Sequence, residues 1–345
     1  MQTMLAARYL GPMRVEAVRV PLPQIADEEA LVKVSACGFC GSDISIIAGT
    51  HPRAKAPLTI GHEFCGTIVE IRSTRTDLAV GDLVTSYPLI SCGRCFVCRT
   101  GNSHVCRRLQ LFGFDVDGGM AEFVKLPVSS LLKLPQGLPP VRGAMVEPLA
   151  VAVHGVSRAP VQGATTAVVI GAGTIGILTA LVARSRGISQ VMICDILPSR
   201  LKLAEELGLR TVAAGEDLKE LTNAVTDGDG VDIVFECAGA PDTARDMTAL
   251  VRCRGTIVNI GVFKKPVAVD MQAVNFKELS IVGSRVYARE DFQQAAAMSE
   301  QIPLHRIVTH SFVLGDVRAA FECSQRGEGA CKVIIHPAGP VALNE

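Results

Sequence analysis

The sequence predicts an α/β protein with two domains, one built on a doubly wound parallel sheet and the other rich in β-structure. Short apolar runs separated by Gly, Pro and Asp fill the chain up to about residue 150, and apolar runs of strand length then alternate with helical patterns. A chain of 345 residues corresponds to about two domains. We therefore expect one domain over 1–150 and 285–345, and a second over 151–284.

The elements follow from these runs in order. In the first domain, 30–34 and 67–71 are typical of the short strands of an antiparallel barrel or sandwich. Five apolar runs predict parallel strands buried on both faces, and they are 167–170, 190–194, 231–236, 255–261 and 279–283. Beyond residue 284 the pattern predicts helices over 291–300 and 316–325 and a strand over 332–335, which return the chain to the first domain.

The charge balance limits the range of partners. The chain carries 34 basic and 34 acidic residues, and no basic cluster that could meet a phosphate backbone or an anionic membrane. The uncharged segment 159–183 is long enough to cross a bilayer, but glycines and threonines divide it into a strand, a turn and a helix. Arg8 comes too early for a secretory signal peptide. We therefore expect a cytoplasmic protein that binds neither nucleic acid nor membrane.

Four of the twelve cysteines lie in one loop, at Cys92, Cys95, Cys98 and Cys106. Gly93 and Gly101 allow the tight turns that can bring the four thiols onto one ion. Four thiolates fill the tetrahedral shell of zinc and leave no position for a substrate, so the loop predicts a structural zinc site. The alternatives are an iron–sulfur cluster, whose bacterial spacing begins in the same way but continues with x3-Cys-Pro, and four unpaired thiols.

A second group of metal-binding side chains occurs in the first domain, at Cys40, His62, Glu63 and Glu147. Three such groups around zinc leave one position open, where the ion can accept a substrate oxygen and stabilise negative charge on it. On spacing alone, packing roles for Cys40 and His62 are the alternative.

The motif Gly171-Ala172-Gly173-Thr174-Ile175-Gly176 follows an apolar strand and opens a helical run. In this setting the first Gly permits the turn, the second lets the backbone approach a pyrophosphate, and the third packs the helix on the strand. Asp195, at the end of the next predicted strand, can accept two ribose hydroxyl hydrogen bonds and would repel a 2′-phosphate. The sequence therefore predicts NAD rather than NADP as the cofactor, with Arg200 as the counter-evidence because it could bind that phosphate.

The motifs together resemble the zinc-containing medium-chain alcohol and polyol dehydrogenases; they are Cys40-Gly41-Ser42-Asp43, Gly61-His62-Glu63, the four-cysteine loop, Glu147-Pro148 and the glycine motif. The resemblance covers nearly the whole chain. It is strongest for the sorbitol, threonine and sugar-acid dehydrogenase branch, because Glu147 stands where simple alcohol dehydrogenases typically carry a cysteine. It implies a Rossmann cofactor domain, a GroES-like catalytic domain and a homodimer or homotetramer.

The resemblance also implies roles for single residues. The ligands of a catalytic zinc ion would be Cys40 and His62, with Glu63 as a ligand or a near neighbour that can swing onto the metal, and Glu147 as a direct or water-mediated fourth partner. Ser42 would take the proton of the substrate hydroxyl, and Asp43 would orient the zinc-binding histidine. Relatives carry a relay histidine where this chain has Ser45, so the proton would leave through ordered water, with His51 as the alternative carrier.

Further contacts are implied around the substrate and the cofactor. The substrate would meet Phe114, Arg285 and Tyr287, and Arg200 would lie against the adenosine ribose. The expected protein is a dehydrogenase with two zinc ions per chain that oxidises a secondary hydroxyl of a polyol, sugar alcohol or sugar acid to a ketone with NAD. The alternatives are a threonine-type amino-alcohol or phosphorylated-polyol dehydrogenase and, in another class, a cofactor-binding family member without catalysis.

Overall fold

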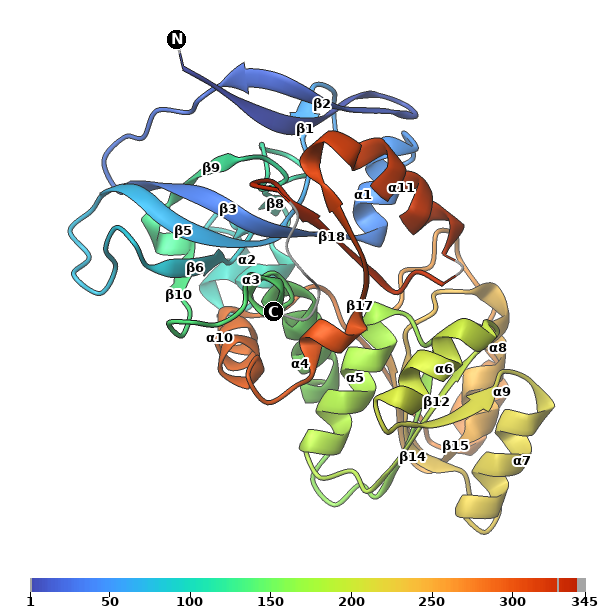
Figure 1. Cartoon of the computed structure of the whole chain (residues 1–345). Coiled ribbons are helices and arrows are strands. Elements are labelled where there is room, and N and C mark those ends of the chain that lie inside the picture. The colour runs from blue at the N-terminus through green and yellow to red at the C-terminus, as the bar shows by residue number, and fades with distance from the viewer. Residues whose placement is uncertain (1, 328, 340–345) are drawn as a thin grey trace. The chain divides into compact units, whose positions relative to one another are not determined.

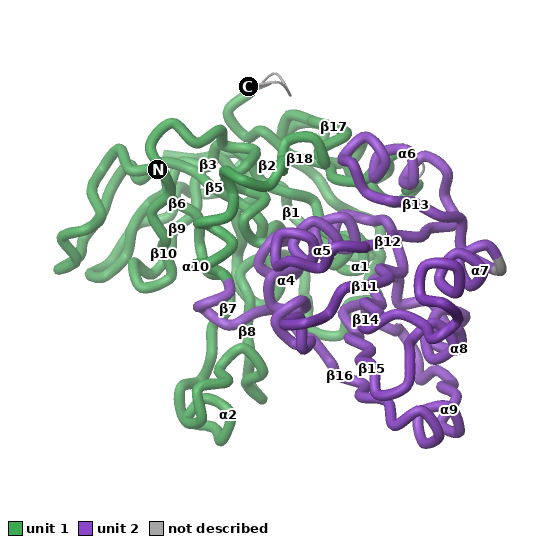
Figure 2. Tube along the Cα trace, turned by 90° about the horizontal axis from the view of Figure 1, so that it is seen from below, with its two compact units in different colours: residues 1–147, 292–345 green, residues 148–291 purple. Residues whose placement is uncertain are grey.

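The computed structural model describes residues 2–327 and 329–339, and the chain divides into two compact units (Figure 2). Unit 1 comprises Met1–Glu147 and Phe292–Glu345, and unit 2 comprises Pro148–Asp291. The predicted α/β class, with a β-rich part and a parallel sheet, is confirmed.

Unit 1 contains a three-stranded sheet in the order β2-β1-β4, a seven-stranded sheet in the order β10-β6-β5-β3-β18-β17 with β9 paired to β3, and the pair β7-β8. Its strands are β1 (Thr3–Gly11), β2 (Arg14–Pro21), β3 (Glu29–Phe39), β4 (Leu58–Thr59), β5 (Glu63–Arg72), β6 (Leu83–Ser86), β7 (Leu89–Ile90), β8 (Gln110–Leu111), β9 (Phe123–Pro127), β10 (Leu131–Lys133), β17 (Val308–Val313) and β18 (Lys332–His336). Its α-helices are α1 (Gly41–Ile47), α2 (Phe96–Arg99), α3 (Pro140–Ala144) and α11 (Val317–Arg326). Two further helices, α4 (Val146–Ser157) and α10 (Arg289–Met298), run across the unit boundaries.

Strand β3 organises the larger sheet because it pairs with β5, β9 and β18 (Figure 1). Eight of its eleven residues are buried, and the polar Glu29, Lys33 and Ser35 are the half-buried or exposed ones. The antiparallel pairing with β18 places Val333 opposite Phe39 and Ile335 opposite Cys37. The C-terminal part of the chain thereby contributes a strand next to the residues that lead into Cys40.

Unit 2 contains a six-stranded parallel sheet in the order β13-β12-β11-β14-β15-β16. Its strands are β11 (Thr166–Ile170), β12 (Gln190–Asp195), β13 (Arg210–Ala213), β14 (Val231–Glu236), β15 (Val251–Asn259) and β16 (Ser280–Gly283). Its helices are α5 (Thr174–Ser185), α6 (Pro198–Glu206), α7 (Glu216–Val225), α8 (Pro241–Leu250) and α9 (Met271–Phe276). All five predicted strands are present, whereas the sequence did not reveal β13, a short edge strand with exposed and half-buried residues instead of an apolar run.

The uncharged segment 159–183 forms β11, the glycine turn and most of α5. Among the helices that the structure describes, none is both long and apolar enough to cross a membrane.

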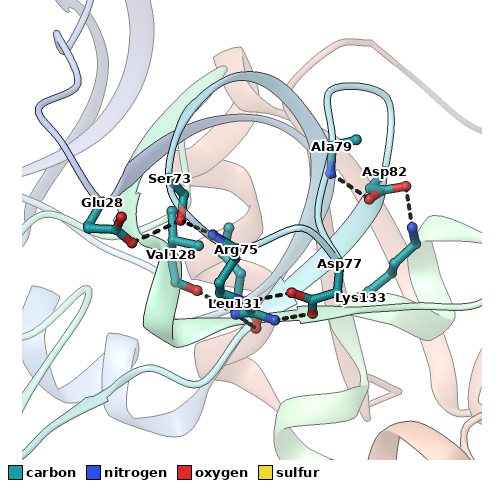
Figure 3. Close-up of polar contacts among 9 residues, drawn as sticks. All are labelled: Glu28, Ser73, Arg75, Asp77, Ala79, Asp82, Val128, Leu131 and Lys133. Carbon is teal, nitrogen blue, oxygen red and sulfur yellow. Dashed lines mark hydrogen bonds and ion pairs between the residues drawn. The ribbon is translucent and has the colours of Figure 1, made fainter.

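A surface network fixes the loop after β5 (Figure 3). The Arg75 guanidinium donates to the Val128 carbonyl at 2.9 Å and forms an ion pair with Asp77. The Glu28 carboxylate accepts from the Ser73 hydroxyl at 2.9 Å. The bonds of Arg75 tie the loop to the segment between β9 and β10, and the bond of Glu28 ties it to the start of β3.

Candidate active site

Three metal-binding side chains meet in unit 1. The sulfur of Cys40, one imidazole nitrogen of His62 and one carboxylate oxygen of Glu63 all lie within 4.8 Å of one another. Cys40 caps the start of α1, and His62 and Glu63 stand at the start of β5. Gly61 takes φ +91° just before them, and a Cβ there would lie 2.7 Å from the Cys37 sulfur, so only glycine fits this turn.

Negative charge surrounds the imidazole of this group. Burial alone would lower the pKa of His62, but the sulfur of Cys40 and the charges of Asp43 and Glu147 raise it well above its ordinary value. A field that favours a proton on His62 also favours a divalent cation beside it. The thiol, imidazole and carboxylate therefore fit zinc both in donor type and in local charge.

Asp43 connects the two segments that carry the donors. It is fully buried and accepts hydrogen bonds from the amides of Cys40 at 2.9 Å and Gly61 at 3.3 Å. Its Oδ1 lies 4.0 Å from Nδ1 of His62, which is too long for a hydrogen bond, and Nδ1 has no hydrogen-bond partner within the described chain. Asp43 thus positions the backbone around His62 and does not bond its ring.

Glu147 and Phe114 lie around this group. Glu147 is buried in the first turn of α4, outside the set of donors that lie within 4.8 Å, but near enough to raise the pKa of His62. The ring of Phe114 stands edge-on between two imidazoles, 4.8 Å from His62 and 5.0 Å from His51. Nδ1 of His51 accepts backbone amides, and burial lowers the pKa of this ring.

The four-cysteine loop forms a second donor cluster, made of Cys92, Cys95, Cys98 and Cys106. Its sulfurs are 3.4 to 4.0 Å apart in the pairs Cys95–Cys98, Cys95–Cys106 and Cys92–Cys98. The amides of Arg107 and Cys98 lower the pKa of Cys95 to about 6, whereas burial and the neighbouring sulfurs raise the pKa of Cys98 to about 11. Thiolates are the ligands that zinc needs, so this cluster fits a closed four-sulfur zinc site.

The glycine motif forms a turn between β11 and α5. Gly171 has φ +100°, and α5 begins at Thr174, directly after Gly173. A Cβ at Gly176 would overlap the Gly171 carbonyl, whereas a Cβ at Gly173 would meet only Arg200, at 4.0 Å. The turn therefore leaves open space in front of the amides at the start of a helix, as a pyrophosphate requires.

Asp195 ends β12 beside this turn. Its carboxylate accepts from the amides of Ala172 at 2.7 Å and Leu197 at 2.9 Å, and Arg200 Nη1 lies 3.5 Å away. Within residues 2–327 and 329–339, Nε of Arg200 is buried with no hydrogen-bond partner. The same is true of Asn259 Oδ1, in the last residue of β15, and of Ser284 Oγ, directly after β16. Unpaired polar groups at this edge of a parallel sheet fit a bound dinucleotide.

Comparisons with known proteins agree with this geometry. Residues 26–136 match the alcohol dehydrogenase GroES-like domain, and residues 174–301 match the zinc-binding dehydrogenase family. The chain is 35% identical to sorbitol dehydrogenase from Halalkalibacterium halodurans, over 92% of this chain and 94% of that protein. It is 33% identical to L-threonine 3-dehydrogenase from Bacillus licheniformis, again over 92% and 94%.

The chain belongs to the zinc-containing alcohol dehydrogenase family. A crystal structure from Sinorhizobium meliloti 1021, assigned as a zinc-binding dehydrogenase and bound to NADP, matches it with a TM-score of 0.92 at 34% identity, over 98% of this chain and all of that one. The predicted branch of sorbitol, threonine and sugar-acid dehydrogenases is confirmed, as is an oxidoreductase of the alcohol and polyol type.

Lys332 is the member of this zinc dehydrogenase site that sequence reasoning missed. It is 2% exposed, its ammonium forms an ion pair with Glu63, and it donates to the Phe39 carbonyl at 3.2 Å. Burial would lower the pKa of Lys332, but Glu63 and Cys40 raise it. A Cβ at Gly38 would overlap the Glu63 carboxylate, so this glycine makes room for the pair. Lys332 stands at the start of an apolar strand, and nothing in the surrounding sequence indicates that its ammonium lies beside Glu63.

The predicted substrate residues of this dehydrogenase differ in their surroundings. Arg285 is exposed, and Phe114 packs against His62. Tyr287 is fully buried, which favours a packing role for its ring over direct contact with a substrate.

Proposed function

We propose that the protein oxidises a secondary hydroxyl of a polyol, sugar alcohol or sugar acid to a ketone, with NAD as the hydride acceptor and two zinc ions per chain. The convergence of Cys40, His62 and Glu63, with Glu147 buried nearby, supports this proposal most directly. Zinc, when bound, would supply a Lewis acid for the substrate oxygen, and nicotinamide would accept the hydride.

The chain's own residues would position the substrate and move its proton. Cys40 and His62 would hold the catalytic zinc together with Glu147, directly or through water, and Glu63 would be a ligand or a neighbour that can turn onto the ion from its pair with Lys332. Ser42, half-buried in the first turn of α1, would take the hydroxyl proton as its own proton passes to ordered water. The Ser45 hydroxyl donates to the Gly41 carbonyl at 3.3 Å, so water would carry the proton onward, with His51 as the alternative. An unchanged pH profile of kcat in His51→Ala would remove His51 from this path.

The preference for NAD is inferred from Asp195, whose carboxylate would meet the ribose hydroxyls and repel a 2′-phosphate. Arg200 already lies 3.5 Å from Asp195, which supports a place against the ribose instead of on a free phosphate. The NADP bound to the Sinorhizobium meliloti protein is the opposing observation. Comparing kcat/KM for the two cofactors decides between them, and a preference for NADP would refute the argument from Asp195.

The decisive experiment measures zinc per chain together with NADH production on a panel of polyols and aldonates. We expect near two zinc ions in the parent. Cys40→Ala should keep the fold and the structural zinc but lose activity, whereas Cys92→Ala should lose the structural zinc. One zinc ion and no turnover on any substrate would favour a cofactor-binding protein without catalysis.

The same panel tests a threonine-type amino-alcohol dehydrogenase, which the identity to L-threonine 3-dehydrogenase favours as the second candidate. Oxidation of L-threonine with a kcat/KM well above that of every polyol would replace the first proposal by the second.

We also propose a homodimer or homotetramer that assembles through unit 2. The edge strand β16 is largely exposed, and Met271 and Phe276 on neighbouring α9 are 64% and 74% exposed. An open strand edge beside exposed apolar side chains is a surface that a second copy can cover. A light-scattering mass equal to one chain would refute this assembly.

A further inference from the structure

A cavity of about 650 Å³ lies beside the four-cysteine loop in unit 1. The segment that carries α2 extends from the rest of this unit beyond β7 and β8 (Figure 2). The cavity, here named the arginine cavity, is lined by the basic residues Arg53, Arg94, Arg107 and Arg108. Asp115 contributes the one carboxylate among its lining residues.

The guanidinium groups differ in how they are paired. Arg53 is half-buried, donates to the Leu109 carbonyl and lies 3.2 Å from Asp115. Arg94, Arg107 and Arg108 are exposed to solvent, and their side chains have neither a carboxylate nor a hydrogen-bond acceptor among residues 2–327 and 329–339. Four guanidinium groups thus face one carboxylate, of Asp115, and one thiol, of Cys92, and this net positive lining attracts anions.

The backbone of the same three arginines is held by the cysteine sulfurs. The amide of Arg108 donates to Cys106 at 3.3 Å, and the amides of Arg94 and Arg107 bond Cys92 and Cys95. Backbone amides therefore meet the negative charge of the thiolates, and the guanidinium groups line the cavity. Zinc in the loop would fix the sulfurs and, through these amides, the three arginine positions.

We propose that the arginine cavity binds a small phosphate-bearing anion, such as a pyrophosphate or a phosphomonoester. Guanidinium forks match phosphate oxygens in pairs, and a multiply charged anion can engage several of them at once. The neutral Gln110 and Ser91, which also line the cavity, can add hydrogen bonds. The volume admits a pyrophosphate with part of its organic substituent. The residues that line the cavity belong to unit 1, whereas the dinucleotide turn belongs to unit 2.

Isothermal titration calorimetry with inorganic pyrophosphate, on zinc-loaded protein at low ionic strength, tests the proposal. Arg107→Gln/Arg108→Gln should weaken pyrophosphate binding at least tenfold with zinc content unchanged. Arg14→Gln, an exposed arginine on β2, is the matched control and should bind as the parent does. NADH would displace pyrophosphate that is bound at the glycine turn, and the affinity of that site would not change in the Arg107→Gln/Arg108→Gln variant. Arg94→Gln repeats the measurement if the double variant does not fold.

Two results would overturn the proposal. One is pyrophosphate binding that the cavity variants leave unchanged, or that is absent from the parent. The other is loss of zinc from the double variant when the parent binds no pyrophosphate, because the arginines would then serve only to balance the thiolate charge.

Discussion

At the scale of single residues, the buried ion pair Lys332–Glu63 should be highly sensitive to mutation. The side chains are 3% and 2% exposed, and removal of one partner from a buried ion pair leaves the other charge without compensation. Lys332→Met should lower the free energy of unfolding by about 3 kcal/mol. Urea denaturation measures this loss.

The same variant tests how Lys332 acts on the metal site. Without its ammonium, the Glu63 carboxylate is free to turn toward a bound metal, so the visible spectrum of the cobalt-substituted protein should change. Lys332→Arg keeps the charge and should largely restore both stability and spectrum. A Lys332→Met protein with the parent's stability and spectrum would show that the pair has no such role.

At the scale of elements, Asp232 joins the starts of three parallel strands. It accepts from the amides of Thr165 at 2.8 Å and Thr166 at 2.9 Å, and from Arg252 Nε at 2.8 Å. Burial alone would raise the pKa of Asp232, but these hydrogen bonds lower it from 3.8 to about 2. The ionised carboxylate therefore stabilises unit 2 above pH about 4, and this contribution is lost as the pH falls toward 2.

Asp232→Asn should lower the free energy of unfolding by about 1–2 kcal/mol at pH 7, and by much less at pH 2.5. Thermal unfolding at the two pH values gives both differences. Asp229→Asn changes an exposed carboxylate of the preceding turn and serves as the control. An equal loss for Asp232→Asn at both pH values would mean that the charge is not what stabilises the strands.

The loop of Figure 3 is held in place largely by the guanidinium of Arg75, just as the Asp232 carboxylate holds three strands together. Arg75 holds two carbonyls, of Val128 and Leu131, as well as Asp77, and its replacement by Gln should cost about 1–2 kcal/mol. Amide hydrogen exchange should rise over 73–82 and stay unchanged in unit 2. Arg72→Gln, whose side chain is 56% exposed, should leave the exchange of this loop as in the parent.

At the scale of the whole molecule, the two zinc sites should differ in how firmly they hold their ions. The Cys40 group offers three donors within 4.8 Å, whereas the cysteine loop offers four sulfurs. Under a chelator we expect zinc to leave in two phases, with activity lost in the first and the loop unfolding in the second. Zinc content and NADH production sampled over time measure this order. Simultaneous loss of both ions would contradict it.

Much of the molecule could be predicted because its signals are local. The glycine turn and the cysteine loop lie within short segments, and the apolar strands of unit 2 are buried on both faces. Strand β13 and Lys332 were not predicted because neither carries a local signal in the sequence. The first is an exposed edge without an apolar pattern, and the second gains its role only where β18 pairs with β3.

The position of Lys332 also has a consequence for the order of synthesis. The ammonium that neutralises Glu63 is separated from it by 269 positions along the chain. A ribosome releases Cys40, His62 and Glu63 long before it makes Lys332. Until then, the Glu63 carboxylate of the nascent chain lacks the ammonium that neutralises it. A metal ion captured early would supply the missing positive charge, and the last strand of the sheet would then seal the pocket over it.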